Sequence, residues 1–241
     1  MRGGKYALKK EKYTIERFDV LPSTNDCAKE KRAEGKNVIV IAKAQTGGRG
    51  TKGRSFSSAL GGVYMSVSTF YEELPARQAF RIMQNAATAV CETLVAFGLT
   101  PVIKWPNDIL VGGKKICGIL IENTFAGNNV RSSIVGIGLN VKNELPEDLR
   151  EIATTMQSAT GKEIAVDKVE ERLLKELSNV NGWKKYPRYV GFIGEEVALL
   201  CGETTITVTV IGVDSEGNLL ARTAEGERTF SSAEVSLRSG R

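Results

Sequence analysis

The sequence predicts an α+β fold, in which helices pack on one mixed β-sheet and a small β-rich domain follows. Two observations carry this prediction. Up to about residue 190, strand-like runs alternate with a few helical segments, whereas beyond it only short strand-like runs separated by turns remain. We therefore expect a larger domain over residues 1–190 and a small β-barrel over residues 191–241.

The first elements follow from local chemistry. Residues 13–21 read as a strand that ends at Pro22, and residues 23–26 supply N-cap oxygens for a helix that closes near Gly35. The apolar, β-branched run 38–42 is typical of a buried strand.

The middle of the chain combines one long helix with further strands. Apolar residues at helical spacing predict an amphipathic helix over 75–97, stopped by Gly98. Gly112-Gly113 predicts a tight turn. The remaining elements are expected as strands at 63–70, 102–105, 116–122, 133–141, 197–200, 205–211 and 219–223, and as helices around 147–156 and 167–181, with turns at 202, 214–218 and 225–227.

The composition excludes several classes of site. The 241 residues are 41% hydrophobic and carry a net charge of +5 spread along the chain, which gives nucleic-acid binding little support. There is no histidine, so the usual general base and the commonest metal ligand are missing. The four cysteines form no C-x-x-C pair, which disfavours a zinc or iron–sulfur site and is typical of reduced thiols. No apolar run is long enough for a bilayer, and we expect a cytoplasmic protein without membrane contact.

A glycine-rich loop, TGGRGTKGRSFSS at 46–58, contains the spacing G-x-G-x-x-G and nearly matches a phosphate-binding P-loop. Both motifs require a helix directly after the glycines, but the chain continues into the strand at 63–70, so we reject both. What remains is a flexible backbone that carries Arg49, Lys52 and Arg54, which could bind a carboxylate or phosphate or form a solvated basic hairpin.

A second motif is Lys104-Trp-Pro-Asn-Asp108 followed by Lys115-Ile-Cys-Gly-Ile-Leu-Ile-Glu122. Asn107 and Asp108 sit at a rigid corner and offer ligands for a nucleotide or Mg²⁺, or simply form a polar turn. Lys114 and Lys115 begin a strand, so their side chains point to opposite faces and only one can face a ligand.

These motifs, together with Ser23-Thr-Asn, Gly136-Ile-Gly-Leu-Asn140 and Ser236-Leu-Arg238, occur in the order found in biotin–protein ligases, and from Ser23 to the C-terminus the chain resembles that family. The resemblance implies a catalytic domain like that of class II aminoacyl-tRNA synthetases and a C-terminal Src-homology-3-like barrel. It also implies that biotin and ATP form biotinyl-adenylate, which then biotinylates a lysine of a biotin carboxyl carrier protein, such as that of acetyl-CoA carboxylase. The first nucleophile is already a carboxylate, so the lack of histidine is no obstacle.

The resemblance assigns roles to individual residues. Lys115 and Arg49 would be catalytic, and Asp108 would bind Mg²⁺. The biotin site would comprise Ser23, Thr24, Asn25, Gln45, Arg49, Gly50, Thr51, Lys115 and Gly118. Ser23 or Thr24 could also simply cap a helix. The ATP and adenylate site would comprise Arg54, Phe56, Asn107, Asp108, Asn140 and Arg238.

The chain departs from the family pattern in places. Thr51 replaces an arginine common in the loop, which predicts a looser grip on the adenylate, and Phe56 replaces a tryptophan. About twenty residues precede Ser23, too few for the helix-turn-helix domain of some relatives, so we expect neither DNA binding nor a repressor role.

Two rival functions stay open, a lipoate–protein ligase or octanoyltransferase and a non-catalytic biotin-binding module. The K-W-P-N-D motif and the β-rich tail disfavour the first, and retention of Arg49 and Lys115 disfavours the second. The sequence leaves the oligomeric state open, a homodimer included.

Overall fold

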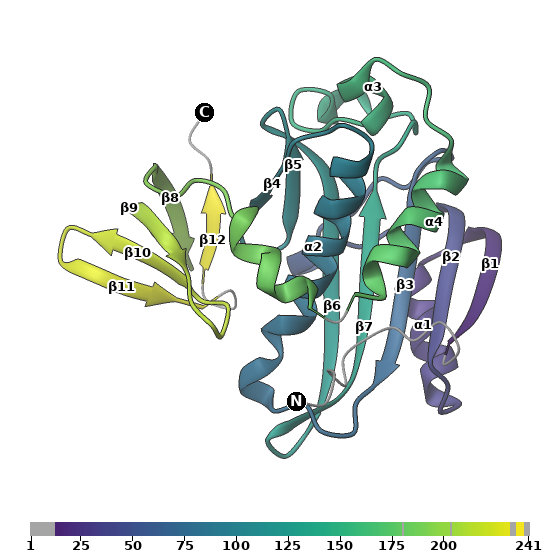
Figure 1. Cartoon of the computed structure of the whole chain (residues 1–241), viewed down its shortest axis with the longest axis horizontal. Helices are drawn as coiled ribbons and strands as arrows, with labels where there is room; N and C mark the ends of the chain where they lie inside the picture. Colours follow the sequence, from purple (N-terminus) through teal and green to yellow (C-terminus); the bar gives the residue numbers. More distant parts are fainter. Residues whose placement is uncertain (1–12, 180, 203, 232–234, 239–241) are drawn as a thin grey trace.

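The computed structural model describes residues 13–179, 181–202, 204–231 and 235–238, without the side chains of Lys52 and of 235–238. Two β-sheets organise the chain (Figure 1). The larger has seven strands in the order β1-β2-β3-β7-β6-β5-β4; β1 pairs parallel with β2, and all other pairs are antiparallel. Its strands are β1 (Thr14–Leu21), β2 (Val38–Gln45), β3 (Val63–Phe70), β4 (Pro101–Lys104), β5 (Asp108–Val111), β6 (Lys114–Ala126) and β7 (Asn129–Leu139).

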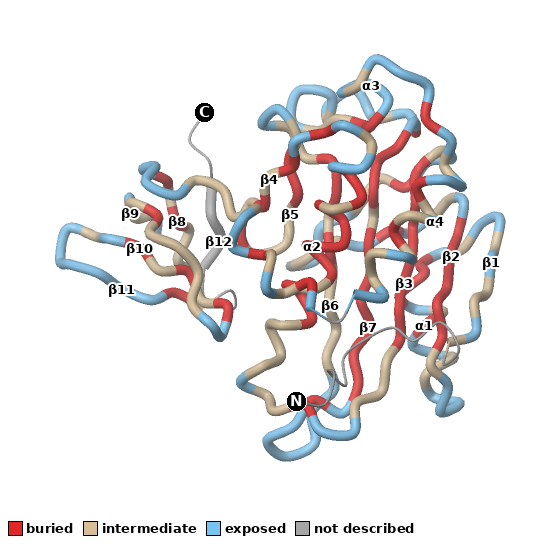
Figure 2. Tube along the Cα trace, in the orientation of Figure 1, coloured by how far each residue is buried: buried red, intermediate tan, exposed pale blue. Residues whose placement is uncertain are grey.

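Helices cover both faces of this sheet. Helices α2 (Phe80–Ala96) and α4 (Val166–Leu177) pack on one face, and α1 (Thr24–Ala33) packs on the other (Figure 1). In β2, Ile39 and Ile41 face the α2 side while Val38 and Val40 face α1. Burial on both sides explains why this strand is continuously apolar, and the inner strands are the most buried part of Figure 2.

The smaller sheet has five antiparallel strands in the order β11-β10-β9-β8-β12. They are β8 (Glu196–Cys201), β9 (Thr204–Val213), β10 (Leu219–Thr223), β11 (Gly226–Phe230) and β12 (Val235–Arg238). The predicted fold class is therefore confirmed: a mixed sheet with helices packed on it, followed by a small antiparallel β domain.

Most predicted elements are present, with three differences. Strands β5, β11 and β12 are additional to the predicted strands: β5 begins at the predicted corner, β11 begins inside a predicted turn, and β12 follows the last predicted strand. The helix expected at 147–156 is wrong in extent, because only a 3₁₀ turn, η4 (Glu147–Leu149), forms before α3 (Met156–Thr160). The backbone of residues 152–154, between η4 and α3, instead pairs with Lys115. The Lys115 N–H donates to Ile152 O at 2.8 Å, and the Lys115 carbonyl accepts from Thr154 N at 2.9 Å. A seven-residue 3₁₀ helix, η5 (Gly182–Arg188), was also missed.

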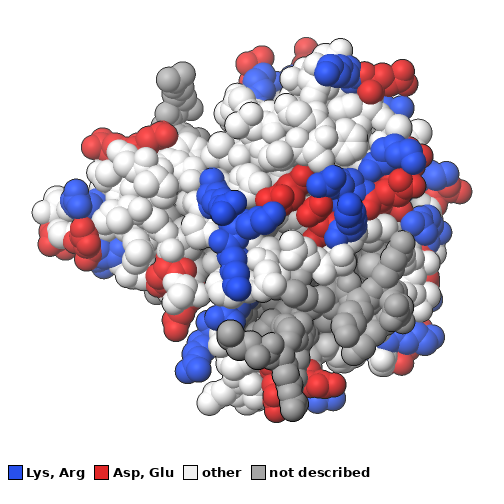
Figure 3. Space-filling view, in the orientation of Figure 1, with Lys and Arg blue, Asp and Glu red and all other residues white. Residues whose placement is uncertain are grey.

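Surface charge on the face shown in Figure 3 is mixed, and acidic and basic side chains form a band over α4. Much of this charge is paired, as in Arg17–Glu170, Lys168–Glu171 and Arg172–Glu176. Among the described residues, no helix is long and apolar enough to cross a membrane.

Trp105 joins the two domains. It directly follows β4, is 2% exposed and packs in the core of the small domain against Leu199, Leu219 and Phe230. Its indole Nε1 donates to Gly217 O at 2.9 Å. The small domain therefore shares its core with a residue of the K-W-P-N-D motif, which ties its position to the strand that precedes Asn107 and Asp108.

Replacing Gly217 by alanine is expected to loosen this junction. Gly217 has a φ of +93°, and an added Cβ would overlap the Phe80 ring. Strain and overpacking together should lower stability by about 1–3 kcal/mol, measured as a lower melting temperature. Gly212→Ala is the matched control, because nothing lies within 4 Å of a Cβ at that position. Equal melting temperatures for the two variants would contradict this account.

Asp214 lies in the same turn as Gly217, and its carboxyl makes the folding stability of the protein depend on pH. Burial raises the pKa of this carboxyl, but hydrogen bonds from the Asn218 side chain and from the backbone of Asn218 and Glu216 outweigh it, and the net pKa is lowered. A lowered folded-state pKa adds stability above the ordinary Asp pKa, and this stability is lost as pH falls through the folded value. Asp214→Asn should therefore lower the melting temperature at neutral pH, with a gap to the parent that closes below about pH 4. A gap that stayed constant with pH would argue against this role.

Candidate active site

A pocket that is partly open to solvent lies where the N-terminus of α1, the glycine-rich loop and the strands β6 and β7 meet. It is lined by Ser23, Thr24, Asn25, Gln45, Arg49, Gly50, Thr51, Arg54, Ser55, Phe56, Asn107, Lys115, Gly118, Ile119, Leu120, Gly136, Ile137 and Gly138. The structure thus brings together most of the residues that the sequence predicted for the biotin and nucleotide sites.

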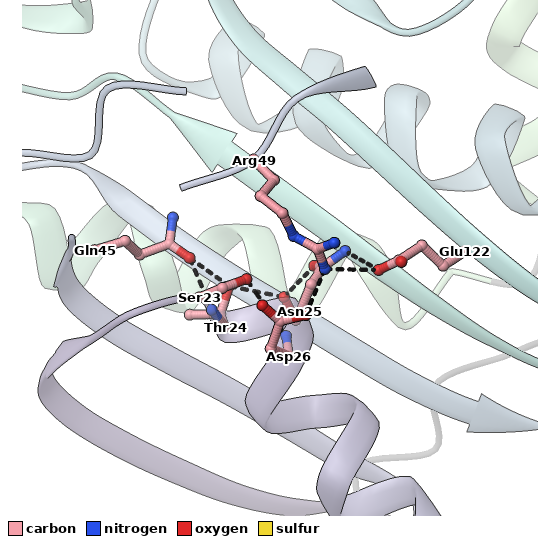
Figure 4. Close-up of polar contacts among 8 residues, drawn as sticks. Ser23, Thr24, Asn25, Asp26, Gln45, Arg49 and Glu122 are labelled. Atoms are coloured by element: carbon pink, nitrogen blue, oxygen red, sulfur yellow. Dashed lines mark hydrogen bonds and ion pairs between the residues drawn. The ribbon is translucent and has the colours of Figure 1, made fainter. Parts of the chain in front are cut away.

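One end of the pocket is a buried polar network. The backbone N–H and the hydroxyl of Thr24 donate to Gln45 Oε1 at 2.8 and 3.0 Å (Figure 4). Gln45 Nε2 donates to Ser58 Oγ at 2.9 Å. Ser23 caps α1 by accepting from Asp26 N at 3.4 Å, so the capping interpretation holds beside its position in the pocket. Ser23, Thr24 and Asn25 are each at most 5% exposed, which fixes their orientation before any ligand binds.

The glycine-rich loop folds back on itself. Gly50 N donates to Arg54 O at 2.6 Å, Phe56 N donates to Gly48 O at 2.8 Å, and Arg49 and Ser55 form a β-bridge. A three-residue 3₁₀ turn, η2 (Thr51–Gly53), is the only helical turn described between β2 and β3. The rejection of both phosphate-loop motifs is therefore confirmed.

Arg49 points from the loop toward α1 and β6. Its Nη2 donates to Asp26 Oδ1 at 2.5 Å and to Glu122 Oε2 at 3.4 Å (Figure 4). Arg54, by contrast, stays within the loop, where its Nε and Nη2 donate to the backbone and hydroxyl oxygens of Thr51. The two arginines thus have different surroundings, although both line the pocket.

Lys115, from the start of β6, also lines the pocket. Its Nζ is 2.7 Å from Asp108 Oδ1 and 5.9 Å from the centre of the Phe56 ring. Lys114 points away, with its Nζ donating to Arg150 O at 2.7 Å, so the prediction that only one lysine of the pair faces the pocket is confirmed. The buried neighbour Cys117 has its pKa raised by loss of solvent, which keeps this thiol neutral.

Glycines in β6 and β7 leave room for these side chains. A Cβ on Gly138 would lie 2.6 Å from the Phe56 ring, and one on Gly118 would lie 3.3 Å from Lys115 Nζ. A Cβ on Gly136 would overlap Asn25 Oδ1. Sequence reasoning assigned no role to Gly136 and Gly138, although their motif was part of the resemblance.

The remaining predicted residues vary in position. Asn107 lines the pocket, and its Nδ2 donates to Ile119 O at 2.9 Å, whereas Asp108 reaches the pocket only through Lys115. Asn140 is 4% exposed and is not among the lining residues; its amide binds Thr154 O and Asn143. The backbone of Arg238, in β12, pairs with Ala198 of β8, but the Arg238 side chain lies outside the described part of the structure.

The pocket combines a neutral polar end with three cations, Arg49, Arg54 and Lys115, along its walls. Such a site suits a small molecule whose polar head group is linked to a carboxylate, with a phosphate bound beside it. Fold and site together suit an enzyme that activates a carboxylic acid by holding two anions in one pocket.

Family models agree with this class. The model described as Biotin/lipoate A/B protein ligase family matches residues 17–140, and the model described as Biotin protein ligase C terminal domain matches residues 192–238. The chain belongs to the biotin/lipoate A/B protein ligase family.

Individual relatives point the same way. The chain is 35% identical to the bifunctional ligase/repressor BirA of Bacillus subtilis, over 91% of this chain and 72% of that protein. It is 27% identical to the biotin–[acetyl-CoA-carboxylase] ligase of Paracoccus denitrificans, over 81% and 88% of the two chains. The structure of the biotin protein ligase of Aquifex aeolicus in complex with biotin and ATP superposes with a TM-score of 0.75 at 30% identity, covering 94% of this chain and 99% of that one.

Proposed function

We infer that the chain is a biotin–protein ligase. It activates biotin with ATP to biotinyl-5′-AMP and pyrophosphate, and then transfers the biotinyl group to a lysine of a biotin carboxyl carrier protein, releasing AMP. The observation that carries this inference is that Arg49 and Lys115 line the same pocket as the polar network of Thr24, Asn25 and Gln45, in a chain that belongs to this family.

The biotin carboxylate is the nucleophile of the first step and needs no base. The barrier comes from bringing it against a negatively charged phosphate, so the protein's task is positioning and charge stabilisation. Lys115 is suited to bridge the carboxylate and the α-phosphate, and Arg49 to bind the phosphate and valerate chain. The ring end of biotin would be met by Ser23, Thr24, Asn25 and Gln45, whose short polar groups match its ureido oxygen and N–H groups.

The nucleotide side of the site stays a proposal. Phe56 would stack on adenine, and Arg54 and Asn107 would contact the nucleotide, with Gly50, Thr51 and Gly118 close to the bound adenylate. Asn140 and Arg238 keep the nucleotide roles that the resemblance implies, as predictions only. Asn140 could reach the nucleotide only if its bonds to Thr154 and Asn143 rearrange.

Mg²⁺ fits this site as an ion that arrives with ATP. Among the described residues, no group of three or more Asp, Glu, Cys or His side chains is placed to bind a metal, and Asp108 is paired with Lys115. One carboxylate together with phosphate oxygens is nevertheless a common magnesium environment. We therefore propose Asp108 as its protein ligand. The ion would neutralise charge on the phosphates.

The match of residues 192–238 to a biotin protein ligase C-terminal domain favours this function over a lipoate ligase. The domain boundary at 190/191, the acetyl-CoA carboxylase carrier as partner, a homodimer and a cytoplasmic location remain predictions. The expected lack of DNA binding also remains a prediction.

Thr51→Arg is expected to slow the loss of biotinyl-AMP from the enzyme. An arginine would add a charge-assisted hydrogen bond worth about 1.5–3 kcal/mol in a favourable setting, or roughly a tenfold or greater change in off-rate. The measurement is the decay of enzyme-bound adenylate after dilution into excess unlabelled biotin. Thr205→Arg, at an exposed position of β9, adds the same charge as a control. A Thr51→Arg enzyme that releases adenylate as fast as the parent would show that Thr51 does not limit retention.

ATP–pyrophosphate exchange tests the proposed function, run with biotin and in parallel with lipoate. Exchange that depends on biotin alone is the expected result. Exchange with lipoate instead would move the protein to the rival ligase function. Biotin binding without any exchange would support a non-catalytic binding module.

A further inference from the structure

Glu122 lies on β6 just beyond the pocket, four residues after Gly118 and therefore on the same side of the strand. One oxygen, Oε2, accepts from two residues of different segments, Asn25 Nδ2 at 2.9 Å and Arg49 Nη2 at 3.4 Å (Figure 4). A single carboxylate thus contacts both the polar end and the cationic part of the site.

The contact with Asn25 fixes which way its amide faces. A carboxylate can only accept, so it is Nδ2 that turns toward Glu122. Asn25 Oδ1 is then left for Ser66 Oγ, which lies 2.6 Å away. Asn25 is 5% exposed and lies directly against Gly136, which leaves its side chain little freedom. Without Glu122, the Asn25 amide would lose the acceptor that determines which side its nitrogen faces and which side its oxygen faces.

The contact with Arg49 sets the direction of the guanidinium. Asp26 and Glu122 both bind the same nitrogen, Nη2, so a bound anion can be met by Nε and Nη1. The side chains of Arg49 and Asp26 are 43% and 52% exposed, and ion pairs this exposed contribute little to stability. What they provide is orientation of a loop residue whose backbone is rich in glycine.

We propose that Glu122 is a positioning residue that aligns Asn25 for the biotin ring and Arg49 for the adenylate phosphate at the same time. Asp26 assists with Arg49 alone. This proposal rests on the proposed function of the pocket. It predicts that a substitution of Glu122, which lies outside the pocket lining, changes both biotin affinity and adenylate retention. A substitution of Asp26 should change adenylate retention alone.

Three variants of the full chain test this: Glu122→Ala, Glu122→Gln and Asp26→Asn. The measurements are the Kd for biotin by calorimetry and the release rate of biotinyl-AMP. Glu122→Ala should weaken biotin binding about tenfold and speed adenylate release about tenfold. Asn25 and Arg49 each lose a hydrogen bond to the Glu122 carboxylate in this variant. Glu122→Gln should restore biotin affinity to near the parent value, because its amide oxygen still accepts from Asn25, while adenylate release stays fast. Asp26→Asn should change release only.

Glu170→Ala is the matched control, because Glu170 also accepts from an arginine, Arg17 at 2.7 Å, but Arg17 does not line the pocket. It should match the parent in both measurements. Glu122→Ala with both values within twofold of the parent would overturn the proposal, as would Glu122→Gln that binds biotin as weakly as Glu122→Ala. A parent chain that fails to bind biotin or to form the adenylate would instead refute the proposed function itself.

Discussion

Lys115→Gln is expected to reduce biotin-dependent ATP–pyrophosphate exchange by roughly 10²–10³-fold, the usual cost of losing one group that stabilises charge in a transition state. Lys115 Nζ lies 2.7 Å from Asp108, and its side chain lines the pocket and is 34% exposed, so under the proposed function it would be a cation close to both reacting anions. Glutamine retains a hydrogen bond to Asp108 but not the charge. The loss should appear mainly in kcat, because the interaction is strongest when the carboxylate and phosphate join.

Lys114→Gln is the control for this change, as it removes the same charge from the adjacent residue. Lys114 Nζ donates to Arg150 O on the far side of the strand, so its removal should leave exchange within about twofold of the parent. Equal losses from the two substitutions would mean that net charge or strand stability, and not the position of Lys115, explains the effect.

Gly136→Ala is expected to raise the Kd for biotin by roughly 5–150-fold, which corresponds to the 1–3 kcal/mol typical of an overpacked buried site. Gly136 pairs with Ser66 on one side and Leu120 on the other, and an added methyl would overlap Asn25 Oδ1. Asn25 would have to leave its position between Ser66 and Glu122. Biotin affinity can be measured by calorimetry on the purified variant.

Gly138→Ala offers a comparison two residues further along β7, where the added Cβ meets Phe56 and not Asn25. It should affect ATP more than biotin, since Phe56 is proposed to stack on adenine. If both alanine variants weakened biotin binding equally, the separation of the pocket into a biotin end and a nucleotide end would be wrong.

Much of the fold could be predicted because its signals are local. The continuous apolar run of β2 follows from burial on both faces, and the cap of α1 follows from Ser23. The errors arose where distant segments decide. Residues 152–154 are not helical because their backbone pairs with Lys115, a partner that no local pattern indicates. Strand β5 is short, and its pairing depends on the Gly112-Gly113 turn and on β6.

The site divides in the same way. Residues inside recognisable motifs, such as Arg49 and Lys115, were predicted and lie together. Glu122 is the last residue of the motif that begins at Lys115, but the sequence gives it no role. Its contacts with Asn25 and Arg49 form only because β6 lies beside α1 and the glycine-rich loop. Asp26 likewise resembled an ordinary first-turn acid that favours a helix N-terminus. Their contacts with Asn25 and Arg49 depend on three-dimensional packing.

The most direct test of the account is biotin transfer in a purified system that contains this chain, ATP, Mg²⁺, biotin and a biotin carboxyl carrier protein. We expect the mass of the carrier to increase by one biotinyl group, with no increase for a carrier whose target lysine is replaced by arginine or for the Lys115→Gln enzyme. A carrier that stays unmodified while the parent enzyme forms biotinyl-AMP would contradict the assignment as a biotin–protein ligase.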